Sequence, residues 1–184
     1  MSDTVKSALT TLIAGEHPTP DAIRGCFNEI MNGDVNEPQI AAFLIALKIR
    51  GERVEDIAAA ATVMREKALK VSAGEGAIDI VGTGGDGFGT YNISTASAFV
   101  VAGCGITVAK HGNKAVSSKS GAADVLSALG IKIDCDPSLL TASMAEAKIA
   151  FLMAPRHHSA MRHVAPVRSD RKSTRLNSSH QIIS

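Results

Sequence analysis

Aromatic residues are scarce in this 184-residue sequence: it has no tryptophan, one tyrosine and five phenylalanines. Proteins that bind single-stranded nucleic acid stack bases on aromatic side chains, so this scarcity argues against such a function. The formal net charge of +1 provides no basic field for non-specific nucleic-acid binding. No apolar run approaches the roughly 18 residues of a membrane span, and no basic region precedes an apolar core as in a secretory signal. We expect a soluble cytoplasmic protein that binds neither nucleic acid nor a membrane.

Cysteine is sparse as well. The sequence has Cys26, Cys104 and Cys135, an odd number with wide spacing and no CxxC pair. Such a set does not build a disulfide framework, and it is typical of a reducing compartment. We expect three small, buried and unreactive side chains.

The C-terminal residues 169–184 differ from the rest of the chain. They lack apolar periodicity and are rich in serine, arginine and asparagine. Within them, DRKSTRLNSSH (170–180) resembles the in-frame translation of a sequencing-adapter oligonucleotide. We expect this tail to be non-native, and a natural polar tail is the alternative. The natural gene would then continue beyond Arg168, and the chain would be a fragment.

Residues 1–70 have the pattern of helices without strands. Apolar residues recur at helical spacing, and proline stands where two of the helices would begin. The predicted helices span about residues 5–13, 20–31, 39–50 and 54–69. We expect an all-helical domain, followed by a linker at residues 71–76. Because its alanine-rich faces exceed what so small a unit can bury alone, we also expect a homodimer through these helices.

From residue 77 to residue 168 the pattern changes to alternating strands and helices. The expected strands are 78–81, 106–109, 131–133 and 150–153, and the expected helices are 93–102, 122–129 and 137–147. Strand–helix–strand repetition implies a parallel sheet with right-handed crossovers. The fold class is therefore α/β, with a small all-helical N-terminal domain before a truncated parallel-sheet domain. Ligands are expected at the carboxyl ends of the strands.

A glycine-rich loop follows the first expected strand. Residues 82–87 read GTGGDG, and a helix opens after them at NIST, residues 92–95. The glycines satisfy GxGxxG, but the second strand ends in Lys110 and His111, where a dinucleotide-binding fold has an acidic residue for the ribose. No Gly-Lys-Ser/Thr follows, which excludes a Walker A loop. Closely approaching backbone N–H groups and a helix N-terminus instead favour a phosphate site.

Two further loops at strand ends carry polar side chains. KHGNKAVSSKSG at residues 110–121 holds three lysines, a histidine and three serines, a set that suits a polyphosphate. Ordinary solvated charges and helix caps are the alternative interpretation. After the fourth strand come His157, His158, His163 and Arg168. Adjacent histidines point in different directions, so we expect a histidine and an arginine to contact an acidic second substrate rather than a shared metal.

Together these motifs resemble the anthranilate phosphoribosyltransferase family, which has a fold of the nucleoside phosphorylase/phosphoribosyltransferase type. The resemblance covers residues 1–168, about half of a family member, and it rests on GTGGDG (82–87), NIST (92–95), KHGNKAVSSKSGAADVL (110–126), HH (157–158) and VR (167–168). It implies an enzyme of tryptophan biosynthesis that uses Mg²⁺. This enzyme transfers the phosphoribosyl group of phosphoribosyl pyrophosphate (PRPP) to the amine of anthranilate and releases pyrophosphate. Residues 77–168 would be an incomplete PRPP-binding domain.

The resemblance also implies site residues, position by position. It places at the PRPP site Gly82, Gly85, Asp86, Thr90, Asn92, Ser94, Thr95, Lys110, His111, Gly112, Asn113, Lys114, Ala115, Val116, Ser117, Ser118 and Ala122. Ser94 would also be a magnesium ligand. Beside anthranilate it places Gly82, Asn113, His158 and Arg168, with Arg168 pairing with the carboxylate. No covalent nucleophile is expected, because the anthranilate amine is itself nucleophilic and orientation carries much of the rate.

Two departures from the family pattern qualify these expectations. Ala122 stands where members often have serine, which removes one hydroxyl contact. The downstream Asp-Glu pair that holds magnesium has no counterpart here, so we expect this chain itself to be inactive. One alternative is an enzyme like pyrimidine-nucleoside phosphorylase, whose loop reads Lys-His-Ser-Thr-Gly-Gly where this chain has Lys-His-Gly-Asn. Another is a non-catalytic paralogue that binds nucleic acid or a protein partner.

Overall fold

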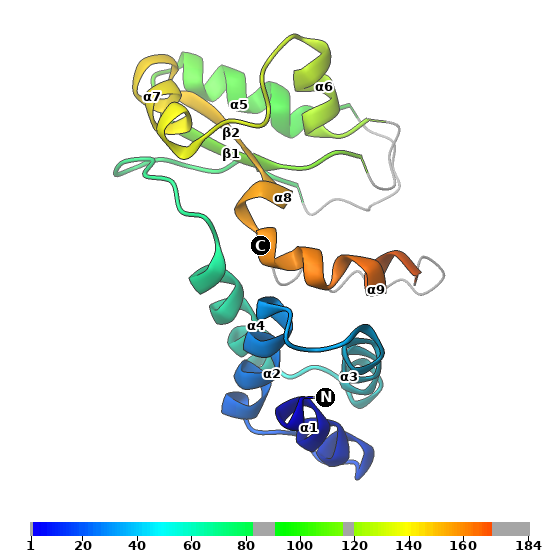
Figure 1. Ribbon diagram of the computed structural model, residues 1–184. Coiled ribbons are helices and arrows are strands. Elements are labelled where there is room, and N and C mark those ends of the chain that lie inside the picture. The colour runs from blue at the N-terminus through cyan, green and yellow to red at the C-terminus, as the bar shows by residue number, and fades with distance from the viewer. Residues whose placement is uncertain (1, 83–90, 116–119, 171–184) are drawn as a thin grey trace. The chain divides into compact units, whose positions relative to one another are not determined.

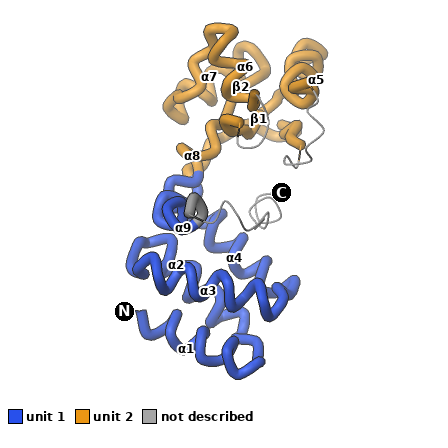
Figure 2. The backbone as a smooth tube through the Cα atoms, turned by 90° about the vertical axis from the view of Figure 1, so that its right-hand side faces the viewer, with its two compact units in different colours: residues 1–68, 158–184 blue, residues 69–157 orange. Residues whose placement is uncertain are grey.

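The computed structural model describes residues 2–82, 91–115 and 120–170. The chain forms two compact units, one of residues 1–68 with 158–184 and one of residues 69–157 (Figure 2). Each unit has buried hydrophobic clusters of its own. Within the described ranges, no helix combines the length and the apolar composition needed to cross a bilayer.

Helices α1 to α4 build most of the first unit (Figure 1). They span Asp3–Ile13 (α1), Pro20–Asn32 (α2), Glu37–Arg50 (α3) and Val54–Lys67 (α4). Side-chain oxygens of Ser2, Thr19 and Asn36 accept N–H groups of the first turns, which explains where α1, α2 and α3 begin. Gly33, with φ of 87°, ends α2 in the left-handed conformation that favours glycine. The helices expected from the sequence are therefore confirmed.

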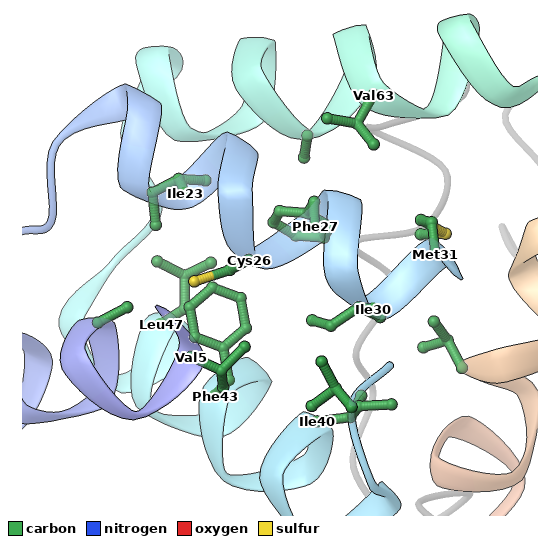
Figure 3. Close-up of a cluster of buried hydrophobic side chains, with 14 of the residues drawn as sticks. Val5, Ile23, Cys26, Phe27, Ile30, Met31, Ile40, Phe43, Leu47 and Val63 are labelled. Atoms are coloured by element: carbon green, nitrogen blue, oxygen red, sulfur yellow. The ribbon is translucent and has the colours of Figure 1, made fainter. Parts of the chain in front are cut away.

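The core of the first unit is formed by apolar side chains from all four helices (Figure 3). Phe43 is fully buried, and its ring meets that of Phe27 edge to face with centroids 5.8 Å apart. Val164 and Val167 are buried in the same core. The short helices after residue 157, Ser159–His163 (η1) and Ala165–Asp170 (α9), thus pack with the helical unit. The sequence pattern groups residues up to 168 with the α/β domain, because a local apolar pattern does not say which core will bury it.

The second unit is a small α/β arrangement. Strand β1 (Val108–Gly112) pairs in parallel with β2 (Ile149–Met153), with Val108 opposite Ile149. Its helices are Ile93–Gly103 (α5), Ala122–Ala128 (α6), Pro137–Ala147 (α7) and Ala154–His157 (α8). Because α6 and α7 lie between two parallel strands along the chain, the expected α/β class is confirmed.

Two of the four expected strands are absent from the described sheet. In 78–81, Ile78 alone pairs, through an isolated parallel bridge to Val108. In 131–133, the Ile131 N–H donates to the Leu126 carbonyl at 2.9 Å, which closes the end of α6 instead of joining a sheet. An apolar run becomes a strand only where a neighbouring strand takes up its backbone hydrogen bonds. Our prediction of these two strands was therefore wrong.

The cysteines also differ in part from the expectation. Cys26 and Cys135 are buried free thiols, as predicted, but Cys104 is exposed. Cys104 lies in the turn that caps α5, where the helix ends and its side chains face solvent. The prediction of a buried residue was wrong here, because an apolar sequence neighbourhood does not say which side of a helix end is covered.

Candidate functional site

Three chain segments of the second unit meet at the ammonium group of Lys110, which lies in β1. Its Nζ donates to the Ile80 carbonyl at 2.8 Å and to the Ser94 hydroxyl at 3.4 Å. Ile80 precedes Gly82, the first residue of the glycine-rich loop, and Ser94 stands in the first turn of α5. The segments that sequence analysis assigned to one anion site are therefore joined by direct hydrogen bonds.

Lys110 is almost completely buried, with 2% of its surface exposed. Burial lowers the pKa of its ammonium below the ordinary 10.5, and the nearby Asp79 carboxylate opposes that shift. Because Nζ already donates to two protein oxygens, it can offer its third proton to an anion. Lys110 thus links Ile80 and Ser94 through its own hydrogen bonds.

The N-terminus of α5 supplies further polar groups. Asn92 is the residue before the helix, and its side-chain amide donates to the Ser120 carbonyl at 3.4 Å. Thr95 is buried, and its hydroxyl oxygen has no hydrogen-bond partner among the described residues. The free N–H groups of a first helical turn carry partial positive charge. In this turn the Ile93 and Thr95 N–H groups donate to the Tyr91 and Asn92 carbonyls. The helix dipole and the polar side chains, rather than these two N–H groups, would favour an anionic ligand.

The base of the loop between β1 and α6 is closed by Asp124. One carboxylate oxygen accepts the N–H groups of Ala115 and Gly121, both at 2.8 Å. These two bonds lower the pKa of the Asp124 carboxyl below its ordinary 3.8, because they favour the charged form. Sequence reasoning missed this residue. The signal was an acidic side chain at the third position of a helix, where a capping box places it.

Gly121 lies close to the backbone of residues 113–115 in the same loop. A Cβ atom there would be 2.5 Å from the Ala115 nitrogen and 2.7 Å from the Lys114 carbonyl carbon. Both neighbours are backbone atoms, so no side-chain rotation could make room. The Ala123 N–H adds a bond to the Asn113 carbonyl at 3.2 Å. Backbone contacts thus fix both ends of the loop that carries the predicted lysine and serine ligands.

The other predicted site residues differ in whether the structure describes them, how exposed they are and which unit they belong to. Outside the described residues lie Gly85, Asp86, Thr90, Val116, Ser117 and Ser118. Gly82, Asn113 and Lys114 are exposed, whereas His111, Gly112, Ala115 and Ala122 are partly buried. Of the predicted anthranilate residues, Gly82 and Asn113 belong to the second unit, and His158 and Arg168 belong to the first.

A metal ion finds few protein ligands in the described part of the chain. No group of three or more His, Cys, Asp or Glu side chains there could hold one. Ser94 offers a single hydroxyl oxygen, 3.4 Å from the Lys110 ammonium. Magnesium prefers an octahedron of oxygens that includes carboxylates or phosphates. With the described residues alone, a magnesium ion would take most of its oxygens from a bound ligand and from water.

A cavity of about 350 Å³ also opens in the second unit. Apart from Lys110, Thr95, Lys132 and Ser143, its walls are apolar side chains of the α5, α6, α7 and sheet region. Such a lining suits hydrocarbon rather than phosphate. Of the residues predicted to bind PRPP, Thr95 and Lys110 line this cavity.

Comparison with protein families gives two matches that together span most of the chain. Residues 6–68 match the model "Glycosyl transferase family, helical bundle domain". Residues 74–178 match the model "Glycosyl transferase family, a/b domain". The residues on either side of the linker thus match two domains of one family.

Curated relatives with substantial identity carry the name anthranilate phosphoribosyltransferase. The protein of Paramagnetospirillum magneticum is 54% identical over 166 residues, which is 90% of this chain and 48% of the relative. That of Rhodospirillum rubrum is 56% identical over 163 residues, 88% of this chain and 47% of the relative. The chain thus spans about half the length of the curated relatives it matches.

Solved structures under the same name are similar to this one. The enzyme from Thermus thermophilus aligns with a TM-score of 0.79 at 43% identity, over 92% of this chain and 50% of that one. The enzyme from Saccharomyces cerevisiae, in complex with PRPP and Mg, aligns with a TM-score of 0.82 at 29% identity, over 92% of this chain and 52% of that one.

Proposed function

This chain belongs to the glycosyl transferase family whose helical bundle and a/b domain models match it, and from that premise we propose that it carries the PRPP-binding loops of an anthranilate phosphoribosyltransferase. In the proposed reaction, the phosphoribosyl group of PRPP moves to the amine of anthranilate. The products are N-(5-phosphoribosyl)anthranilate and pyrophosphate. The observation that carries the proposal is the junction at Lys110, which ties β1 and the segment at Ile80 to the first turn of α5.

The chemistry needs groups that stabilise a leaving pyrophosphate. The bond from the ribose C1 to pyrophosphate breaks, the amine nitrogen bonds to C1, and the nitrogen then gives a proton to water. Negative charge develops on the leaving group, and donors placed beforehand stabilise it without reorganisation. The Lys110 ammonium, the first turn of α5 and the exposed Lys114 would be such donors. PRPP would enter as its magnesium complex, in which the ion offsets phosphate charge and Ser94 supplies one oxygen.

The second substrate, anthranilate, would contact Gly82, Asn113, His158 and Arg168, as the family resemblance implies. Arg168 would pair with the carboxylate, because a guanidinium matches the two carboxylate oxygens. Binding of this kind orients the amine towards C1, and orientation accounts for much of the rate in such a transfer.

The alternatives have less support. The relatives named above, more than half identical to this chain, favour phosphoribosyl transfer over pyrimidine-nucleoside phosphorolysis. The loop sequence Lys-His-Gly-Asn at residues 110–113 favours it as well. A paralogue that only binds a partner would not need the buried Lys110 junction.

The helical unit would form a homodimer. Three large apolar side chains of this unit, Ile13, Ile49 and Val54, are 80%, 82% and 79% exposed. A second copy of the unit would remove them from water, and two-fold symmetric pairs are the commonest soluble assemblies. Light scattering of the chain at micromolar concentration tests this, and a monomer would refute it.

Calorimetric titration with PRPP and Mg²⁺ tests the proposed function on the 184-residue chain. We expect binding, and binding about tenfold weaker in Lys114→Ala, because a hydrogen bond to a charged group contributes about 1.5–3 kcal/mol. Lys6→Ala, which removes an exposed lysine of α1, is the matched control. Absence of PRPP binding, or equal weakening in both variants, would contradict the proposal.

Turnover gives a second test. We expect no fluorescent phosphoribosyl-anthranilate from this chain alone, since the family's Asp-Glu pair is missing from its sequence. The enzyme of Rhodospirillum rubrum, assayed in parallel, serves as the positive control. Comparable activity in the two would show that the missing pair is not needed.

A further inference from the structure

Regular parallel pairing between residues 78–80 and β1 stops after one residue. The Ile78 N–H donates to the Thr107 carbonyl, and the Ala109 N–H donates to the Ile78 carbonyl, both at 2.9 Å. In a regular parallel ladder the next bond would run from the Ile80 N–H to the Ala109 carbonyl. The bond after it would run from the His111 N–H to the Ile80 carbonyl. Both groups have other partners in this structure.

Two side chains take over these backbone groups. The His111 N–H donates to a carboxylate oxygen of Asp79 at 3.1 Å. The Ile80 carbonyl accepts from Nζ of Lys110 at 2.8 Å. One side chain from each segment thus replaces a ladder bond, so that neither backbone group loses its partner where the chain leaves the sheet.

This replacement of ladder bonds occurs beside the residues that are predicted to bind the anion. Gly82 follows Ile80 by two residues, and Lys110 continues from the Ile80 carbonyl to the Ser94 hydroxyl at 3.4 Å. The Asp79 charge also opposes the effect of burial on the pKa values of Lys110 and His111, which places the carboxylate near both. Asp79 therefore acts on two predicted ligands at once.

We propose that Asp79 is a positioning residue of the PRPP site, which directs the chain out of the sheet towards Gly82 by holding the His111 N–H. This inference rests on the proposed function. Asp79 does not act as a ligand, because its carboxylate would repel a phosphate. It is not among the residues that the sequence predicts to bind either substrate.

Hydrogen exchange of the His111 amide, followed by NMR on the full chain, tests the contact itself. In Asp79→Ala we expect exchange about tenfold faster or more, because a bond to a charged acceptor is lost. Asp79→Asn keeps an acceptor oxygen, so its exchange should stay close to that of the unaltered chain. Glu75→Ala, an exposed acidic residue of the same unit, is the control. Unchanged exchange in Asp79→Ala would overturn the inference while leaving the proposed function intact.

PRPP titration with Mg²⁺ then tests the consequence for binding. We expect Asp79→Ala to bind PRPP about tenfold more weakly, with Asp79→Asn restoring most of the affinity. The urea midpoint of Asp79→Ala should remain close to that of Glu75→Ala, because a positioning role changes affinity and not global stability. Equal PRPP affinity in Asp79→Ala and Glu75→Ala would overturn the inference. Absence of PRPP binding by the unaltered chain would overturn the proposed function as well.

Discussion

Replacing Gly121 by alanine should disrupt the loop between β1 and α6 more than any change of surface charge. The backbone of Gly121 has a φ of −96°, which any residue adopts, so conformational strain plays no part. The effect comes from space alone. The new Cβ would lie 2.5, 2.7 and 2.8 Å from three backbone atoms of residues 113–115.

The size of the effect follows from what must move. Three contacts well inside van der Waals distance cannot be relieved by a rotamer change, so the two ends of the loop must separate. Separation would lengthen both bonds of the Asp124 carboxylate, to Ala115 and to Gly121. Overpacking of this kind costs about 1–3 kcal/mol. We expect a destabilisation in that range for Gly121→Ala.

Gly103→Ala is the matched control. Gly103 is the last residue of α5, and a Cβ there would meet no atom within 4 Å. Alanine in a helix is favoured over glycine by roughly 0.5–1 kcal/mol, so this variant should be neutral or more stable. Urea denaturation measures both stabilities, and PRPP titration shows whether the loop still binds. If Gly121→Ala is as stable as Gly103→Ala and binds PRPP equally well, the close approach has no role in holding the loop.

Three further predictions concern other parts of the chain. Phe43→Ala should lower the free energy of unfolding by about 3–5 kcal/mol, because it empties the centre of the helical core; urea denaturation checks this. The pKa of Asp124 lies below 3.8 because it accepts two backbone N–H groups, so these bonds persist above that pH and are lost as the pH falls through the lowered value. The NMR shift of the Gly121 amide should change with pH as Asp124 titrates. In Asp124→Asn this pH-dependent change should be absent. A thiol reagent should label Cys104 first and Cys26 last, since burial, helped by the charge of Glu29, raises the pKa of the Cys26 thiol to about 12; mass spectrometry of timed samples would show a different order if this reasoning fails.

The helices of the first unit could be predicted because their signals are local. Ser2, Thr19 and Asn36 cap helices within three residues of the N–H groups that they accept. Proline at the start of a helix and glycine at its end act over the same short distance. Such contacts form in the same way whichever core later buries the helix, so the pattern of residues is enough to locate them.

The candidate site was predictable only in outline. That strand-end loops would meet followed from the α/β pattern, because parallel strands bring their carboxyl ends to one edge. That Asp79 and Asp124 would hold those loops in place did not follow, because each contacts a segment whose distance is set by tertiary structure. Asp79 reaches a backbone group 32 residues away.

The sequence by itself determined where helices α1 to α7 lie, that the second unit is α/β, and which loops carry the glycines, lysines and serines of the proposed phosphate site. Only the tertiary structure decided whether an apolar run became a strand, as at residues 78–81 and 131–133, because a strand needs a neighbour to accept its hydrogen bonds. It alone placed Val164 and Val167 in the helical core. It also made Lys110 a buried link between Ile80 and the first turn of α5 rather than a solvated cation, because burial depends on residues far away along the chain.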